Sequence, residues 1–184
     1  MAAPLETERL HLVPFEPGDA ERLIALDADP EVVKYVSLGP FTLPPPERYA
    51  EDVLPRFLAH AADPVLGYWR VHVKPEESAE GLGPFAGWVL FRPVGEAKWF
   101  ESAGELRLDP ATPELGYRFA QAFWGRGYAT EAARAVSDGA GPAVAIRQTE
   151  NVGSGRVLEK CGLPFVRPFQ LPGVPATTAL HQRG

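Results

Sequence analysis

Apolar and polar residues alternate along several short stretches of the chain, which is the pattern expected of half-buried β-strands. The strands that this alternation predicts are residues 9–13, 68–73, 85–91, 105–119 with an interruption at 109–113, 143–149, 165–169 and 177–181. The loops between the middle strands are rich in glycine, proline and glutamate, residues that favour turns. The sequence therefore predicts a sheet built from short strands.

A second pattern, with apolar residues three or four positions apart, predicts amphipathic helices. These helices are residues 19–26, 47–60, 128–136 and 153–161. We expect Asp19 to cap the first helix, and Pro55 to kink the second because proline lacks the N–H that a helix interior uses. Consecutive strands precede the third helix, whereas strands and helices alternate in a doubly wound dinucleotide-binding fold. The pattern indicates another kind of α/β protein.

The composition is that of an ordinary globular domain, and we expect residues 1–184 to form a single domain. Of the 184 residues, 45% are hydrophobic and 23% are charged. The chain has one cysteine, Cys161, so it has no intrachain disulfide, which is typical of a reducing compartment and predicts a cytoplasmic location. No apolar run is long enough to span a membrane, and the amino end carries Glu6, Glu8 and Arg9 rather than a signal peptide.

The charge and the histidine spacing argue against nucleic-acid, membrane and metal partners. The net charge is −6, whereas nucleic-acid-binding domains usually carry a basic excess, so we expect no nucleic-acid partner and no membrane partner. The four histidines are far apart in the sequence and form no HExxH or HxH pattern, so we expect no metal site. An acidic surface is compatible with a cationic partner.

The most informative segment is a glycine-rich turn that leads into a helix. Gly125, Arg126 and Gly127 come directly before the helix predicted at residues 128–136. The first turn of a helix has N–H groups without partners and a partial positive charge, so such a turn can bind a phosphate. By itself, however, the pattern is more often an ordinary turn. It lacks the ending of a Walker loop and is not the dinucleotide fingerprint.

A second segment combines an amide and a hydroxyl at a helix entrance. Asn151 and Ser154 are three residues apart, which puts both on the same side of the helix predicted at residues 153–161. Both residue types are preferred caps, so capping explains one of them without any function.

Together these segments resemble the GNAT superfamily of acetyl-CoA-dependent N-acetyltransferases, and within it the RimJ/RimL-like group that acetylates ribosomal-protein N-termini. The resemblance covers nearly the whole chain and rests on LETERLHLVPF, ELGY, FWGRGYATEA and NVGSGRVLEKCG, which stand in the family's order. It implies an α/β fold with a mixed, mostly antiparallel sheet of about six or seven strands. About four helices would flank this sheet, which would be splayed at the cofactor strand.

The resemblance also implies how acetyl-CoA, the cosubstrate, would bind. Its pyrophosphate would lie on the main-chain amides of the turn and helix start, which are Gly125, Arg126, Gly127, Tyr128, Ala129 and Thr130. Its pantetheine arm would pair with the strand residues Tyr117, Arg118 and Phe119. Asn151 would hydrogen-bond the cofactor, and Ser154 would lie near the thioester sulfur.

Acetyl transfer needs a neutral amine, a polarised carbonyl and a proton for the leaving thiolate. We expect Glu114 to be the general base, although a strand-edge surface glutamate explains it equally well. A main-chain N–H near Tyr117 would polarise the carbonyl. Many GNAT enzymes place a tyrosine donor seven residues after the asparagine, where this chain has Leu158, so Ser154 is the expected proton donor.

The chain departs from the family pattern in three places. The connection at residues 137–142 is short, Gly155 replaces an aliphatic residue, and Gly162-Leu163-Pro164 replaces Gly-Phe. These departures question the packing and the catalytic competence of the second half, but not the cofactor site.

The acceptor is expected to be a primary amine, either of a protein N-terminus or of a small molecule such as a polyamine or an aminoglycoside. Residues 34–46 are expected to cover it. A CoA-binding sensor without transfer activity is the alternative from another class, and a homodimer is left open as the assembly.

Overall fold

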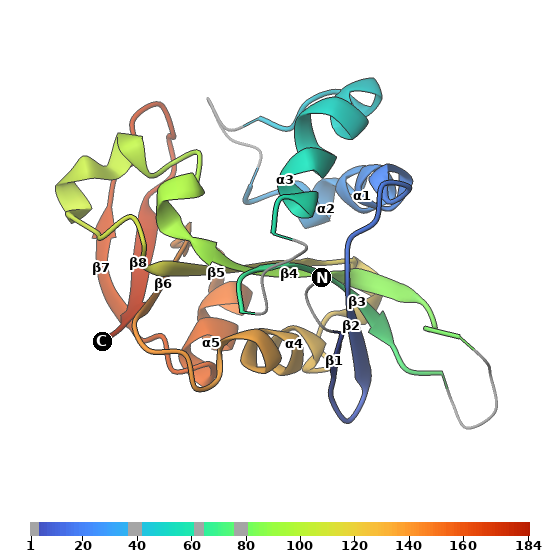
Figure 1. The fold of residues 1–184 in the computed structure, drawn as a ribbon. Helices are drawn as coiled ribbons and strands as arrows, with labels where there is room; N and C mark the ends of the chain where they lie inside the picture. Colours follow the sequence, from blue (N-terminus) through green and yellow to red (C-terminus); the bar gives the residue numbers. More distant parts are fainter. Residues whose placement is uncertain (1–3, 37–41, 61–64, 76–80) are drawn as a thin grey trace.

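One open sheet forms the centre of the molecule (Figure 1). The structure is a computed structural model that describes residues 4–36, 42–60, 65–75 and 81–184. Within these residues the sheet has eight strands in the order β1-β2-β3-β4-β5-β6-β8-β7. They are β1 (Leu5–Glu6), β2 (Leu10–Pro14), β3 (Gly67–Val73), β4 (Phe85–Pro93), β5 (Pro113–Phe119), β6 (Ala143–Gln148), β7 (Phe165–Phe169) and β8 (Thr178–Arg183). Neighbouring strands are antiparallel except β5 and β6, which confirms the predicted mixed, mostly antiparallel sheet.

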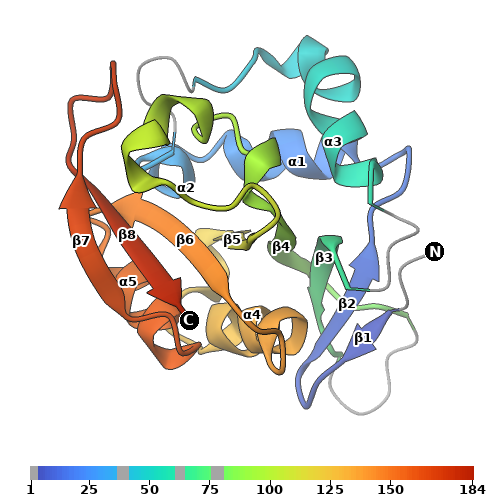
Figure 2. The same ribbon diagram turned by 60° about the vertical axis from the view of Figure 1, so that its left-hand side comes forward.

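Helices cover both faces of this sheet. Helices α1 (Ala20–Asp27), α2 (Pro30–Val33) and α3 (Leu54–Leu58) lie on one face, and α4 (Tyr128–Ser137) and α5 (Val152–Lys160) lie on the other (Figure 1). Figure 2 shows β1 and β2 at one edge of the sheet and β7 and β8 at the opposite edge. In the part of the chain that the structure describes, no helix combines the length and the apolar character that crossing a bilayer requires.

The largest apolar cluster lies between the sheet and the pair α4 and α5. Ala132 and Ala133 of α4 are fully buried, and their small side chains allow the helix to approach Leu115 and Phe119 of β5 closely. Leu158 contributes from α5. Burial of apolar surface on this scale is the main force that holds the two helices against β5 and β6.

Strands β5 and β6 separate along most of their length. A single residue pair, Glu114 with Val144, joins them in parallel register. On its other side β5 is paired with β4 along its whole length, from Pro113 to Phe119. Within the described residues, the main chain of β5 beyond Glu114 therefore faces no strand on its β6 side, and the expected splay at this strand is confirmed.

Two expected elements differ from the structure. The alternating run predicted a strand from residue 105, but Glu101–Leu106 forms a 3₁₀ helix and β5 begins only at Pro113. Leu106 and Leu108 nevertheless pack against an apolar cluster over β6 and β8. The alternation of apolar residues therefore indicated which side chains are buried, and not that the segment is a strand. When an alternating run is short, its periodicity cannot distinguish a strand from another segment with buried side chains.

The second predicted helix is irregular before Pro55, which is the second residue of α3. It consists of a 3₁₀ turn (Pro46–Arg48), a π-helical turn (Tyr49–Val53) and α3. A proline inside a helix has no N–H to donate and its ring crowds the carbonyl four residues before it, so the wide π turn precedes Pro55.

Asp19 precedes α1 but does not cap it through its side chain, so that expectation is wrong. Its carboxylate instead accepts from the main-chain N–H of Glu16 and forms ion pairs with Arg22 and the buried Arg70. A buried guanidinium requires charge compensation, which outweighs the small stabilisation that a helix cap would give.

Candidate active site

The glycine-rich turn forms the entrance of α4, as its sequence predicts. Gly125 and Gly127 adopt left-handed backbone conformations, with φ of +74° and +83°, which glycine tolerates better than other residues. Gly127 is the residue that precedes α4. Among the described residues, no acceptor is bonded to the main-chain N–H groups from Gly125 to Thr130. This stretch therefore keeps the free donors that an anion site needs.

A cleft of about 570 Å³ runs from β5 past this turn to the start of α5. It is lined by all the residues that the sequence assigned to the cofactor except Arg126, namely Tyr117, Arg118, Phe119, Gly125, Gly127, Tyr128, Ala129, Thr130, Asn151 and Ser154. The basic side chains of Arg156 and Lys160 also line it. Acetyl-CoA, the donor that GNAT acetyltransferases use, fits this donor set, because free main-chain amides suit phosphate groups and an unpaired strand edge suits an amide-containing arm.

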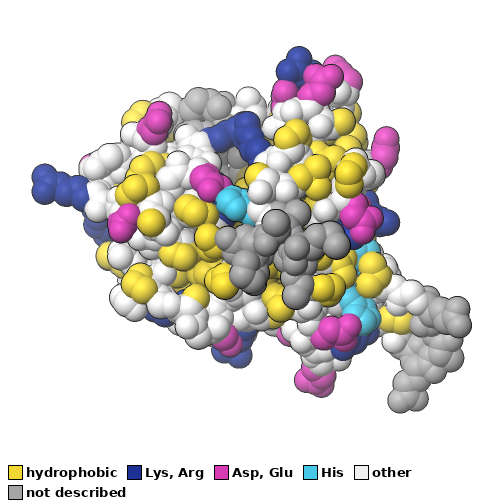
Figure 3. Space-filling model, viewed as in Figure 1, with side chains coloured by type: hydrophobic (Ala, Val, Ile, Leu, Met, Phe, Trp, Pro, Cys, Tyr) yellow, Lys and Arg dark blue, Asp and Glu magenta, His cyan; other side chains and the backbone are white. Residues whose placement is uncertain are grey.

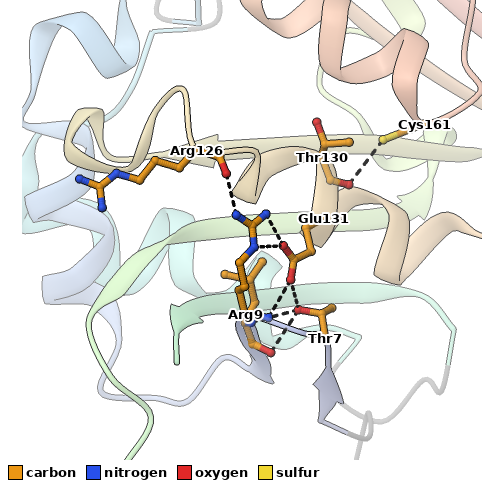
Figure 4. A network of polar contacts seen from close by, with 7 residues as sticks. Thr7, Arg9, Arg126, Thr130, Glu131 and Cys161 are labelled. Carbon is orange, nitrogen blue, oxygen red and sulfur yellow. Dashed lines mark hydrogen bonds and ion pairs between the residues drawn. The ribbon is translucent and has the colours of Figure 1, made fainter. Parts of the chain in front are cut away.

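Arg126 belongs to the turn, but the residue does not line the cleft. The side chain is exposed and points away from the neighbouring polar network, whereas its carbonyl accepts a hydrogen bond from Arg9 at 2.9 Å (Figure 4). The residue therefore contributes its main chain to the turn, and no contact of its guanidinium ties it to the cleft.

Asn151 and Ser154 have different roles at the start of α5. The side-chain oxygen of Asn151 accepts from the N–H of Ser154 at 3.1 Å, so Asn151 is the helix cap. The Ser154 hydroxyl does not cap the helix. It lies 2.9 Å from the Tyr117 hydroxyl, which also donates to the Ser154 carbonyl at 3.0 Å. Burial raises the pKa of Tyr117 above its ordinary value, so the phenol keeps its proton at neutral pH.

From the sequence, Tyr117 was expected to act only through its main chain, so this hydroxyl pair was missed. Leu158, which stands where many family members have a tyrosine, lines the cavity beside Ser154. A phenol thus reaches the same region from β5 instead of from α5. Two features of the sequence could have indicated this pair: Leu158 stands where many family members have a tyrosine, and ELGY contains Tyr117. Only the packing of α5 on β5, however, brings the hydroxyls of Tyr117 and Ser154 together.

A second cavity, of about 270 Å³, meets the cleft where β5 and β6 separate. Both cavities are lined by Tyr35, Val36, Tyr117, Arg118, Asn151 and Ser154. Tyr35 and Val36 belong to the segment 34–46 that was expected to cover the acceptor, of which residues 37–41 lie outside the described residues. A molecule in the second cavity would therefore meet a cofactor in the cleft at Tyr117 and Ser154.

Glu114 lines this second cavity and is buried, which contradicts its interpretation as a surface residue of the strand edge. One carboxylate oxygen accepts from the indole N–H of Trp99 and the other from the guanidinium of Arg92, each at 2.8 Å. Burial raises the pKa of Glu114, and the positive charge of Arg92 opposes this effect only in part. The sequence could not show that Trp99 and Arg92 would surround this carboxylate.

Arg118 is held by the opposite layer of the molecule. Its guanidinium pairs with Asp27 of α1 and lies 5.2 Å from the centre of the Trp88 ring. Asp27 also accepts from the Tyr49 hydroxyl at 3.0 Å. The side chain therefore fixes α1 to β5, and Arg118 also lines the cleft.

The structure accounts for two of the departures from the family pattern. A side chain at Gly155 would come within 2.8 Å of the Arg147 guanidinium, so glycine leaves room for that group. The short connection after α4 is closed by Arg183, which donates to the carbonyls of Ser137, Ala140 and Gly141 at 2.9–3.0 Å. Both sites replace apolar packing with a guanidinium bonded to main-chain carbonyls.

Cys161 joins the end of α5 to the start of α4. Its thiol lies 3.8 Å from the Thr130 carbonyl (Figure 4), and burial raises the pKa of the thiol to about 11. The thiol is therefore neutral at physiological pH and suited to packing rather than to nucleophilic attack.

A splayed sheet whose cofactor strand faces a glycine-lined helix entrance is the architecture of an acetyl-CoA-dependent acyltransferase. The chain belongs to the GNAT acetyltransferase family, since the family model described as "Acetyltransferase (GNAT) domain" matches residues 9–164. A curated relative, the FsC-acetyl coenzyme A-N(2)-transacetylase of Aspergillus fumigatus, is 34% identical over 173 residues. The match covers 90% of this chain and 66% of the relative, so the chain spans slightly less than two thirds of the relative's length.

Solved structures agree with this assignment at the level of the fold. A GNAT-family acetyltransferase from Bacillus anthracis superposes with a TM-score of 0.69 at 22% identity, over 98% of this chain and 97% of that one. The ribosomal-protein α-N-acetyltransferase RimL, in complex with coenzyme A, gives a TM-score of 0.69 at 13% identity, over 98% and 97% of the two chains. The resemblance to the GNAT family and to its RimL-like group is thereby confirmed as a likeness of fold.

The turn makes a testable prediction about cofactor binding. Gly127→Val should weaken CoA binding by at least about tenfold, roughly 1.4 kcal/mol, because a β-branched residue cannot adopt the backbone of this turn without strain and its Cβ would lie within 3.3 Å of the Arg9 guanidinium that is bonded to the turn. Isothermal titration calorimetry with CoA measures the change. Gly139→Val is the matched control, because Gly139 has a similar φ of +78°, has open space where a side chain would lie, and is outside the cleft. Equal affinities in folded Gly127→Val and wild-type protein would move the cofactor elsewhere.

Proposed function

We propose that the protein transfers an acetyl group from acetyl-CoA to a primary amine. The observation that carries this proposal is the junction of the cleft and the second cavity at Tyr117 and Ser154. The cleft would hold the thioester donor, and the second cavity would hold the acceptor amine. Direct transfer requires both reactants at one point at the same time, which two separate but joined cavities allow.

Glu114 would act as the general base in this reaction. It accepts the proton that the amine loses as the nitrogen attacks the thioester carbonyl carbon, and it later releases that proton to solvent. Its burial supports this role, because a raised pKa brings a carboxylate closer to the pH at which it must take up a proton. The main-chain N–H groups on the unpaired side of β5 near Tyr117 would stabilise the carbonyl oxygen during attack.

Ser154 would donate the proton that the thiolate needs when the carbon–sulfur bond breaks. Its hydroxyl is 2.9 Å from that of Tyr117, so the phenol could turn its single O–H from the Ser154 carbonyl to Ser154 Oγ and replace the proton given to sulfur. The phenol then takes up a proton from solvent. The two hydroxyls thus form one donor unit, in which Ser154 touches the sulfur and Tyr117 supports Ser154.

The acceptor is proposed to be an amine of a protein N-terminus or of a small molecule. The name of the Aspergillus relative, an N(2)-transacetylase, supports a nitrogen acceptor. Figure 3 shows acidic and basic side chains interspersed on one face of the molecule. The net charge of −6 therefore does not make that face uniformly attractive to cations. The second cavity, rather than the overall charge, is the proposed source of acceptor choice.

The proposal is tested with a panel of amines. N-terminal peptides, polyamines and aminoglycosides are each mixed with acetyl-CoA, and turnover is read as release of free thiol while CoA binding is measured in parallel. We expect thiol release with at least one amine class and mass-spectrometric evidence of an N-acetyl product. CoA binding without turnover on any amine would favour the sensor alternative, and absence of both would reject the cofactor assignment.

Ser154→Ala should lower kcat by roughly 10- to 100-fold, the range of acid–base assistance, with the CoA dissociation constant little changed. Tyr117→Phe should also lower kcat, and the double variant should lose little more than Ser154→Ala alone because the hydroxyls act as one unit. Thr149→Val, which removes a hydroxyl bonded to the Thr177 carbonyl outside both cavities, is the matched control. Full turnover in both single variants would exclude the donor unit.

Glu114→Gln should lower kcat/KM at pH 7 by roughly 100-fold, since the amide keeps the shape but cannot take a proton. The deficit should shrink as the pH rises toward about 10, the ordinary pKa of a lysine-like amine, because free amine then becomes abundant. In the wild type, kcat/KM should fall on acidification through the raised pKa of Glu114, above its usual value of 4.5.

The control for this variant is Glu96→Gln, because Glu96 pairs with His60 outside both cavities. A deficit of equal size at pH 7 and pH 9.5 would show that Glu114 binds the acceptor's charge instead. The base would then be sought at Glu150, which lines the cleft.

A further inference from the structure

The start of β2 is bonded to the glycine-rich turn, although more than one hundred residues separate them in the sequence. The Arg9 guanidinium donates to the Arg126 carbonyl through Nη1 at 2.9 Å, and to Glu131 Oε2 through Nε at 2.7 Å and Nη2 at 2.6 Å. The other oxygen of Glu131 accepts from the Arg9 main-chain N–H and from the Thr7 hydroxyl at 2.9 and 2.6 Å. Figure 4 shows these groups converging beside the entrance of α4.

The bond to the Arg126 carbonyl fixes the direction of the next N–H. The peptide between Arg126 and Gly127 is trans, so the carbonyl oxygen and the Gly127 N–H point in opposite directions. Since the oxygen points to Arg9, the N–H points away from it. Gly127 lines the cofactor cleft, whereas Arg9 does not. The contact therefore holds one of the free donors of the turn away from Arg9, at a residue that lines the cleft.

Glycine needs such a restraint more than other residues. Gly125 and Gly127 have no side chain to limit their backbone angles, and no atom lies within 4 Å of the position that a Gly125 side chain would take. Without Arg9, the peptide plane between Arg126 and Gly127 could rotate, and the donor would lose its orientation before the phosphate arrives. A donor fixed in advance binds more tightly because binding then costs less conformational entropy.

We propose that Arg9 is a positioning residue for the pyrophosphate of CoA, which acts by fixing the Arg126–Gly127 peptide rather than by touching the cofactor. This inference rests on the proposed use of the cleft for acetyl-CoA. Glu131 neutralises the charge of Arg9. The contribution of Arg9 to cofactor binding is therefore the orientation of the main chain and not an added positive charge. The Tyr128 ring, 4.8 Å from the guanidinium carbon, holds the side chain from another side.

The electrostatics of the network favour a permanent contact. Burial alone would raise the pKa of Glu131, but hydrogen bonds from Thr7 and Arg9 lower it below its ordinary value, so the carboxylate is charged at neutral pH. The Arg9 side chain is 44% exposed and that of Glu131 is 17% exposed. An ion pair with this exposure adds little to global stability, so its removal should leave a folded protein.

The test compares CoA binding to Arg9→Gln and to wild-type protein by isothermal titration calorimetry. We expect the dissociation constant for CoA to rise about five- to tenfold in the variant. Thr7→Val is the control within the network, because it removes a bond to Glu131 but leaves the Arg126 carbonyl bonded. Arg48→Gln removes an exposed ion pair of similar geometry, with Asp52, far from the turn in sequence and outside the cleft. Both controls should keep the wild-type affinity.

A shortened donor separates positioning from general destabilisation. Acetyl-pantetheine lacks the pyrophosphate, so Arg9→Gln should reduce kcat/KM for acetyl-CoA while leaving kcat/KM for acetyl-pantetheine nearly unchanged. An equal reduction with both donors, or an unchanged dissociation constant for CoA, would overturn the proposal. If the wild type itself binds no CoA, the proposed function fails first, so the two failures are distinguishable. Arg9→Lys gives a second measurement, because lysine can keep one ionic contact to Glu131 but not both bonds; a wild-type affinity in this variant would count against the carbonyl contact.

Discussion

The opening between β5 and β6 is the constraint on which the rest of the site depends. On one side β5 is paired with β4 along its full length, and on the other it is joined to β6 only at Glu114 and Val144. Main-chain N–H and C=O groups that face no strand must find other partners, and a ligand with amide groups can supply them. The same divergence leaves room for a cavity on either side of Tyr117. One interrupted strand pairing thus accompanies both the cleft and the second cavity, which are proposed to hold the donor and the acceptor.

Arginine side chains bind main-chain carbonyls at both ends of β6. Arg183 holds the short connection after α4, and Arg147 donates to the carbonyls of Gln148 and Thr149 at 2.9 and 2.8 Å where β6 ends. A guanidinium has five N–H donors in a planar arrangement, so one side chain can satisfy several carbonyls of a turn. Gly155 leaves the space that Arg147 occupies. Two of the three departures from the family pattern are therefore accommodated by arginine side chains.

The environment of Glu114 differs from what the overall charge of the protein suggests. The chain is acidic, but this carboxylate lies in a buried site with Arg92 and the Trp99 indole as its donors. Burial disfavours the charged carboxylate, while both donors stabilise it, and the balance raises its pKa. A carboxylate in this balance is better suited to exchange protons near neutral pH than an exposed one.

The sequence by itself predicted the order of the longer elements and the position of the glycine-rich turn. Alternation located β2, β3, β4 and β6 to within a few residues, and the glycine spacing of the turn located the start of α4, because these features depend on local backbone preferences. Short elements such as β1 and α2 escaped prediction because too few residues carry a pattern.

Only the tertiary structure decided which side chains meet. The Tyr117 and Ser154 hydroxyls, the donors around Glu114 and the contact of Arg9 with the turn join residues 15 to more than 100 positions apart. Sequence periodicity gives the face on which a side chain lies but not the residue across from it. That partner is set by how α5 packs against the sheet and by where β2 is paired within it, which is a property of the whole fold.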